Sequence, residues 1–195
     1  LKEAATNFPA CRLDGYDKNP QAVAAFAGTK IGFVSDLEQH DGKIYDMITA
    51  FQILEHLDDP FSVLRTLKNS LKQGGLLIIC VPNADGPIRH FPDALTEIPP
   101  HHVNRFNETS LRVYLENEKF AVEDVAFEPL PKILWESYLP VMLGKALPPS
   151  LEKLYHNFKG PGIVRRLIKL LRLTGRKALP LRGHSIYIVA RKCAE

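Results

Sequence analysis

The stretch that decides the fold is residues 45–83, YDMITAFQILEHLDDPFSVLRTLKNSLKQGGLLIICVPN. Residues 45–50 predict a short buried strand, and residues 51–57 predict a loop. Asp59 followed by Pro60 predicts the start of a helix, because Asp suits the N-cap and Pro is tolerated in the first helical turn. Apolar residues at spacings of three and four give this helix one apolar face: Phe61, Leu64, Leu67 and Leu71.

The second half of the stretch predicts another strand. Gly74 and Gly75 are expected to end the helix, and the apolar run 76–81 is typical of a strand covered on both faces. A strand, a crossover helix and a strand together indicate a parallel sheet. Pro82 and Asn83 then fall at the edge where open α/β sheets bind ligands.

Several blocks of this stretch occur in the order found in one enzyme family. The blocks YDMITA, ILEHLDDP, LKQGG and LIICVPN resemble the second half of a class I S-adenosylmethionine-dependent methyltransferase, in the branch with a V/I-L-E-H signature after strand four. The resemblance implies an α/β fold with a Rossmann-like, mostly parallel sheet and S-adenosyl-L-methionine as the cofactor. It also implies that the protein is an enzyme.

The N-terminal part predicts two more strands, each ending in an acid. Residues 11–17 end at Asp17 and residues 31–36 end at Asp36, with a helix expected between them. In such folds the Gly-rich turn lies about 20 residues before the ribose-binding acid. We therefore expect the first strand and its Gly-rich loop to be missing from this chain.

Residues 131–180 are rich in proline and predict a helical insertion before the last strand. The expected division is a methyltransferase core at 1–130, a cap at 131–180 and the last core strand at 181–195. The insertion is expected to lie over the active-site edge.

Composition is that of a globular chain, with 45% hydrophobic and 24% charged residues. The three cysteines are odd in number and contain no CxxC, which favours a reducing, cytoplasmic location. No apolar run is long enough to span a bilayer. Residues 1–152 hold 14 Lys and Arg against 21 Asp and Glu, whereas residues 153–195 hold 11 against 1, so the basic charge is local.

The candidate cofactor residues follow the expected strands. Asp17 can accept hydrogen bonds from both ribose hydroxyls, although a strand-terminal Asp can instead cap the next helix. The resemblance assigns the adenine to Asp36 and Leu37 and the methionine moiety to the segment after strand four. The cofactor-binding set is Asp17, Lys18, Asp36, Leu37, Ala50, Phe51 and Gln52.

The candidate catalytic residues are Glu55, His56 and His102, and His101 is an alternative to His102. An alcohol acceptor must lose a proton, which a His titrating near the operating pH can accept. In some relatives E-x-x-E-H and a later His bind a divalent metal. Gln52 replaces the first carboxylate here, and since this weakens a site for a hard cation we predict no metal. A cation at Glu55, His56 and His102 stays an open alternative.

Residues 163–176 predict an amphipathic basic helix with Val164, Leu167, Ile168 and Leu171 on one side. It could be a solvated face, bind an anionic acceptor, or contact a membrane surface; nucleic acid is disfavoured by the few aromatic residues.

The segment 99–106, PPHHVNRF, and the cap together resemble bacterial enzymes of polysaccharide or secondary metabolism. The prediction is O- or N-methylation of a small-molecule or glycan-type acceptor. The rivals are a non-catalytic methyltransferase-like binding module and an NAD-dependent dehydrogenase.

Overall fold

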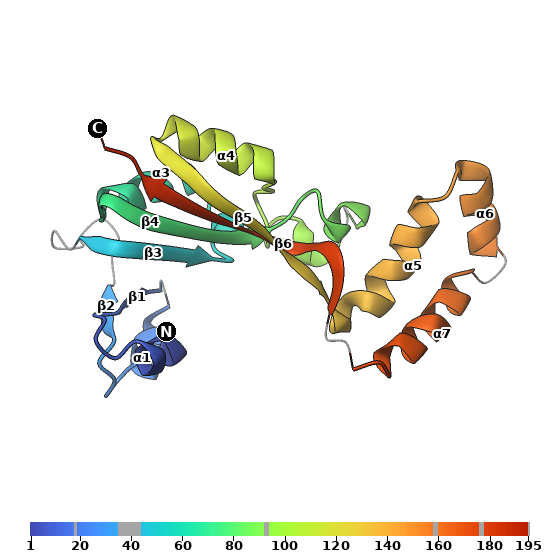
Figure 1. Ribbon diagram of the computed structural model, residues 1–195, viewed down its shortest axis with the longest axis horizontal. Coiled ribbons are helices and arrows are strands. Elements are labelled where there is room, and N and C mark those ends of the chain that lie inside the picture. The colour runs from blue at the N-terminus through green and yellow to red at the C-terminus, as the bar shows by residue number, and fades with distance from the viewer. Residues whose placement is uncertain (18, 35–43, 92–93, 158–159, 176–177, 195) are drawn as a thin grey trace.

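The computed structural model describes residues 1–17, 19–34, 44–91, 94–157, 160–175 and 178–194. Lys18, Asp36 and Leu37 of the expected cofactor site lie outside these residues. Helices and strands alternate from α1 to β2 and again from β3 to β5, and three further α-helices precede the last strand (Figure 1). The helices are α1 (Lys2–Asn7), α2 (Pro20–Ala25), α3 (Pro60–Asn69), α4 (Glu108–Asn117), α5 (Trp135–Lys145), α6 (Pro149–Asn157) and α7 (Gly160–Arg172). The strands are β1 (Asp14–Tyr16), β2 (Gly32–Val34), β3 (Tyr45–Phe51), β4 (Leu71–Pro82), β5 (Phe120–Pro131) and β6 (Ala178–Lys192).

Four strands form the main sheet in the order β3-β4-β6-β5. Strand β3 pairs in parallel with β4, whereas β6 runs antiparallel to both β4 and β5. Strands β1 and β2 form a separate parallel pair. The Tyr45 hydroxyl donates to the Asp14 carboxylate at 2.9 Å and so links β3 to β1. The expected α/β fold with a mostly parallel sheet is confirmed.

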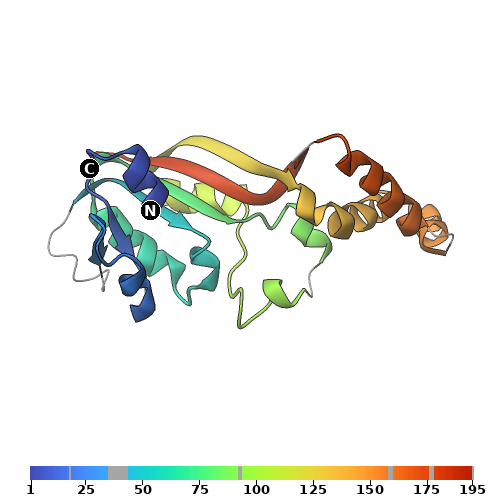
Figure 2. The ribbon, with the colours of Figure 1, turned by 90° about the horizontal axis from the view of Figure 1, so that it is seen from below.

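The core lies on one face of the main sheet. Leu77 and Ile79 of β4 and Ile188 of β6 are fully buried against Leu64 of α3 and Leu111 of α4. Figure 2 shows the sheet edge-on. On the other face, Met47, Phe51 and Tyr187 keep 50%, 51% and 36% of their surface exposed. The prediction that β4 is covered on both faces is confirmed in part: Leu77, Ile79 and Val81 are fully buried, whereas of the alternate residues Cys80 is 3% exposed and Leu76 and Ile78 are half-buried.

The start of α3 is confirmed and its end is not. Asp59 caps the helix by accepting from the Ser62 amide at 2.9 Å, and Pro60 is the first helical residue. The helix ends at Asn69, however, and β4 begins at Leu71 rather than at residue 76. Leu71 therefore belongs to the strand. Phe61, expected on the buried face, is 43% exposed and instead lies against the Tyr114 ring, with the centroids 4.4 Å apart.

The other predicted strands occur but differ in length. The described parts of β1 and β2 are three residues each, shorter than expected. Strands β5 and β6 are longer than expected, and they pair as far as Pro131 opposite Ala178. The described helices of the insertion, α5 to α7, fall within 135–172 and project beyond the sheet (Figure 1). The division into core and cap remains a prediction.

Short 3-10 helices lie between the longer elements. They are η1 (Leu54–His56), η2 (Pro87–His90), η3 (Leu95–Glu97) and η4 (Lys132–Leu134). Helix α5 reaches back to η2, where the Tyr138 ring lies 4.9 Å from Phe91 and 5.8 Å from His184. Among the described residues, no helix is long and apolar enough to cross a membrane.

Candidate active site

Main-chain hydrogen bonds join η1 to the loop before α4. The Glu55 carbonyl accepts from the amides of Val103 at 2.9 Å and Asn104 at 3.1 Å. The Asn104 side-chain amide donates to the Leu57 carbonyl at 2.5 Å. These bonds bring two segments that are far apart in the sequence to one corner, directly after β3.

At this corner Glu55, His56 and His102 form a cluster. One side-chain nitrogen or oxygen atom from each lies within 4.8 Å of the others. Glu55 is only 1% exposed, and within the described part of the chain neither of its carboxylate oxygens has a hydrogen-bond partner. Burial raises the pKa of Glu55, and the nearby imidazoles of His56 and His102 oppose that shift. The structure thus brings the three predicted catalytic residues together.

Both histidines of the cluster use Nδ1 to contact an oxygen. His56 Nδ1 lies 2.6 Å from the His101 carbonyl oxygen, and His102 Nδ1 lies 3.2 Å from Glu97 Oε2. We assign the proton to Nδ1 in each case, since both partners accept. Each Nε2 then keeps a lone pair, which can accept a proton or bind a cation.

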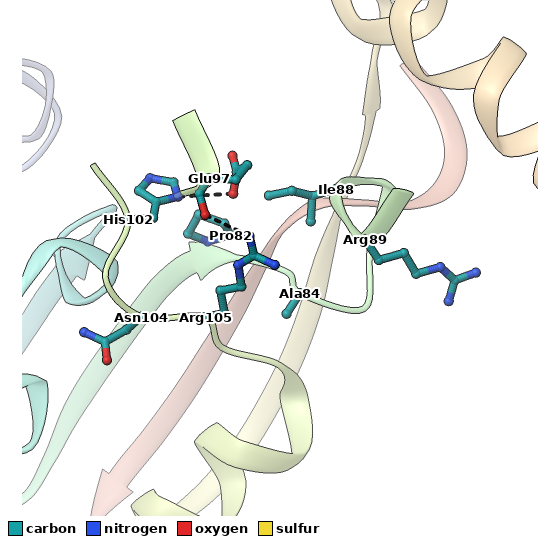
Figure 3. Close-up of a pocket in the computed structure, with 8 residues that line it drawn as sticks. All are labelled: Pro82, Ala84, Ile88, Arg89, Glu97, His102, Asn104 and Arg105. Carbon is teal, nitrogen blue, oxygen red and sulfur yellow. Dashed lines mark hydrogen bonds and ion pairs between the residues drawn. The ribbon is translucent and has the colours of Figure 1, made fainter. Parts of the chain in front are cut away.

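The Glu97–His102 pair lines a cavity of about 160 Å³ beside the carboxyl end of β4. Both side chains are nearly buried, at 8% and 10% exposure, so the hydrogen bond between them is shielded from solvent. Arg105 donates to the Glu97 carbonyl at 3.0 Å, while Arg89 points away from this pair (Figure 3). The remaining lining residues are Pro82, Ala84, Ile88 and Asn104.

The cavity is smaller than the roughly 300–1,000 Å³ of typical ligand pockets. It can therefore enclose the reacting group of an acceptor rather than a whole acceptor. The pKa of the Tyr138 hydroxyl on α5 is raised, mainly because the side chain is partly buried. The negative charge of Glu97 raises it further, which shows that the two side chains lie near each other. The cap thus contributes a residue to the surroundings of Glu97.

The candidate ribose ligand Asp17 is exposed and directly follows β1. Its Oδ1 accepts from the Asn19 amide at 2.8 Å in a local turn, whereas the helix that follows is capped by Asn19, whose Oδ1 accepts from the Gln21 amide at 2.9 Å. Strands β1 and β2 are parallel, with Tyr16 opposite Val34, so their carboxyl ends lie at one edge. Asp36, the second acid of the predicted pair, is not among the described residues.

The residues at the carboxyl end of β3 divide between core and surface. Ala50 is 3% exposed and packs in the core, whereas Phe51 is 51% exposed and lies edge-on to Tyr187, with the centroids 6.4 Å apart. Gln52 has a φ of 52° and donates to the Cys80 sulfur at 3.3 Å. A left-handed non-glycine residue is an unusual conformation that often marks a functional site. Phe51 and Gln52 are thus available to a ligand, while the Ala50 side chain is not.

The sequence reasoning missed Glu97 and Tyr138. Glu97 precedes His102 by five residues in a proline-containing loop, and an acid so close to a candidate base was the available signal. Tyr138 had no such signal, because its place near Glu97 depends on how α5 packs against η2.

A model of the family described as "Methyltransferase domain" matches residues 1–125. The chain belongs to the methyltransferase-domain family. The family prediction made from the sequence blocks is thereby confirmed. The "Ubiquinone biosynthesis O-methyltransferase" of Glaesserella parasuis is 31% identical over 118 residues, which cover 51% of this chain and 48% of that protein. The chain thus matches about half the length of that curated relative.

Solved methyltransferase structures have the same fold. A SAM-dependent methyltransferase from Archaeoglobus fulgidus gives a TM-score of 0.56 at 18% identity, covering 98% of this chain and 80% of that one. The plantazolicin methyltransferase BpumL, solved with SAH, gives 0.57 at 17% identity, covering 100% and 71%. At these identities the likeness establishes the methyltransferase fold of the chain and nothing finer.

Proposed function

We propose that the protein transfers a methyl group from S-adenosylmethionine to a hydroxyl or amine of a small-molecule or glycan-type acceptor. The observation that carries the proposal is the shielded Glu97–His102 pair, which lines a cavity at the carboxyl end of β4. Open α/β sheets bind their ligands at this edge. Membership of the methyltransferase-domain family supports the reaction type.

The described part of the cofactor set fits an adenosyl group. Asp17 offers a carboxylate at a strand end, and Phe51 offers an exposed ring after β3, which suit ribose hydroxyls and an apolar group respectively. We propose that Asp17, Lys18, Asp36 and Leu37 hold the nucleoside. Ala50, through its main chain, and Phe51 and Gln52 would then border the methionine moiety. The bound cofactor would supply an electrophilic sulfonium methyl.

His102 is proposed as the general base. Glu97 fixes its orientation and its tautomer, so that Nε2 can accept the proton of an acceptor hydroxyl as the methyl is transferred. Alignment of the acceptor with the methyl supplies much of the remaining acceleration. Arg89 also lines the cavity, but its guanidinium points away from the Glu97–His102 pair and gives no support to an anionic acceptor over a neutral one.

One observation favours a second role for the same corner. Glu55 is a buried carboxylate without a hydrogen-bond partner in the described structure, and two imidazoles lie beside it. A divalent cation held by Glu55, His56 and His102 would compensate the buried charge and bind an acceptor oxygen. The Nδ1 contacts of both histidines are those of orienting partners in metal sites.

Methyl incorporation from labelled S-adenosylmethionine into a panel of phenols, sugars and nucleotide-linked sugars tests the proposal. We expect His102→Asn to lower kcat by about 10²–10⁴-fold. The affinity for S-adenosylhomocysteine, measured by calorimetry, should stay the same. The matched control is His156→Asn, since that side chain is exposed on α6 and belongs neither to the cavity lining nor to the histidine cluster.

Calorimetry of the full-length protein also tests the rivals. Binding of S-adenosylhomocysteine without binding of NAD supports the methyltransferase. Binding of NAD alone would favour the dehydrogenase, and binding of neither would favour the non-catalytic module.

A further inference from the structure

Helix α7 carries two apolar faces, of which only one is covered. Ile168 is 1% exposed and packs with Leu130 and Trp135. Ile163, Leu167 and Leu170 keep 57%, 54% and 62% of their surface exposed. Residues at i, i+4 and i+7 share a helix face, so these three form one exposed stripe. We call Ile163, Leu167 and Leu170 the α7 stripe.

Unpaired cations lie beside the α7 stripe. Within the described structure no ion pair is formed by Arg165, Arg166 or Lys169, and all three are exposed. Arg172, by contrast, pairs with Glu136 at 2.6 Å and holds α7 to α5. At 100° per residue, Arg166 and Lys169 follow the stripe around the helix on its solvent side. Residues 153–195 contain 11 Lys and Arg and a single acid, so the surrounding field is positive.

The cap offers further apolar surface around this helix. In the neighbouring α6, Leu151 and Leu154 are 47% and 50% exposed. Together with Leu147, Tyr155 and Gly160 they line a cavity of about 280 Å³. Figures 1 and 2 show the three cap helices extending beyond the end of the sheet, at the opposite end of the molecule from the N-terminus. The cap can therefore approach a flat surface without obstruction by the sheet.

We propose that α7 docks on the surface of a bilayer that contains anionic lipids. The α7 stripe would lie among the lipid chains at the headgroup boundary, and Arg166 and Lys169 would bind lipid phosphates. A helix of 13 residues is about 20 Å long and lies in the interface rather than across it. Apolar residues beside unpaired cations are the composition of such interfacial helices.

Other occupants agree less well with these observations. Nucleic acid would use the cations but leaves Ile163, Leu167 and Leu170 exposed to water. A second copy docked through α7 would cover the α7 stripe. It would also place Arg165, Arg166 and Lys169 of one copy near the same cations of the other copy, which repel each other. The lipid surface accounts for both the apolar and the basic residues. The inference does not depend on methyl transfer, since it concerns a different part of the chain.

Sedimentation of the full-length protein with vesicles tests the inference. We expect binding to phosphatidylcholine vesicles that contain about 30% phosphatidylglycerol and little binding to phosphatidylcholine alone. Each cation near an anionic surface strengthens binding about fivefold, so Arg166→Gln with Lys169→Gln should weaken binding about 25-fold at low salt. The matched charge control is Lys2→Gln with Lys30→Gln, two exposed residues of the N-terminal part.

The double variant Leu167→Gln with Leu170→Gln tests the apolar contribution of the α7 stripe and should abolish vesicle binding. Its control is Val113→Gln, an exposed apolar position on α4. Equal thermal unfolding of all variants shows that the fold is kept. Undiminished vesicle binding by the leucine variant overturns the inference. So does an absence of vesicle binding together with tight DNA binding, or with self-association that the leucine variant abolishes.

Discussion

Replacing Glu55 by Gln should stabilise the protein when divalent cations are absent. Glu55 is 1% exposed, and neither carboxylate oxygen has a hydrogen-bond partner among the described residues. Gln has nearly the same shape but carries no charge, so Glu55→Gln removes a buried anion that has no hydrogen-bond partner among the described residues and only a long contact, 3.9 Å, with His56 Nε2. An unsatisfied buried group costs about 1–3 kcal/mol, and more when it is charged. We therefore expect the free energy of unfolding to rise by about 1–2 kcal/mol, or roughly 3–6 °C in Tm.

The pH dependence follows from the direction of the pKa shift. Burial raises the pKa of Glu55 in the folded state. The ionised side chain therefore destabilises the fold, and this penalty is absent below the unfolded-state pKa of about 4.3. It grows as the pH rises towards the folded-state pKa and is constant above it. The advantage of Glu55→Gln should therefore be small near pH 4 and should increase towards pH 8.

Urea unfolding of wild type and Glu55→Gln across this pH range, in EDTA, measures the difference. Glu116→Gln is the control, because Glu116 is exposed on α4. Repeating the series with Mn²⁺ tests the cation role: wild type should gain about 2.7 kcal/mol at 100 times the dissociation constant, and the variant should not. A Glu55→Gln protein that is less stable than wild type in EDTA at pH 8 would refute the reasoning.

Three further predictions concern the fold and the site. Leu77→Ala in β4 should lower the free energy of unfolding by about 2–5 kcal/mol in urea, because Leu77 is fully buried in the core; a loss below 1 kcal/mol would show that this position is not packed as described. Asn107→Ala should lower it by about 1 kcal/mol, because the capping box with Ser110 is lost; no change would mean that the box does not form in solution. Glu97→Gln should reduce kcat without changing the affinity for S-adenosylhomocysteine and should shift the acid limb of the pH–rate profile; an unchanged profile would exclude Glu97 as a positioning residue.

The parts of the fold that depend on local chemistry could be predicted. Asp59 before Pro60 marks the start of α3, because this cap is formed within four residues. The apolar run 76–81 lies within β4 for the same reason. The family resemblance, carried by several blocks in the right order, is confirmed.

The parts that depend on distant contacts could not be predicted. The end of α3 at Asn69 follows from the pairing of Leu71 with Tyr45, which local pattern does not encode. The place of Tyr138 near Glu97 depends on how α5 packs against η2. Leu167 was expected on the apolar side of α7 but is 54% exposed. Its exposure depends on which face of α7 packs against the rest of the cap, and the sequence pattern of α7 does not encode that packing.

A crystal structure of the full-length protein with S-adenosylhomocysteine tests the central claim most directly. The account predicts the ribose hydroxyls at Asp17, with the sulfur beside Phe51 and directed towards the cavity that His102 lines. A cofactor bound elsewhere, or with its sulfur turned away from that cavity, would contradict the account.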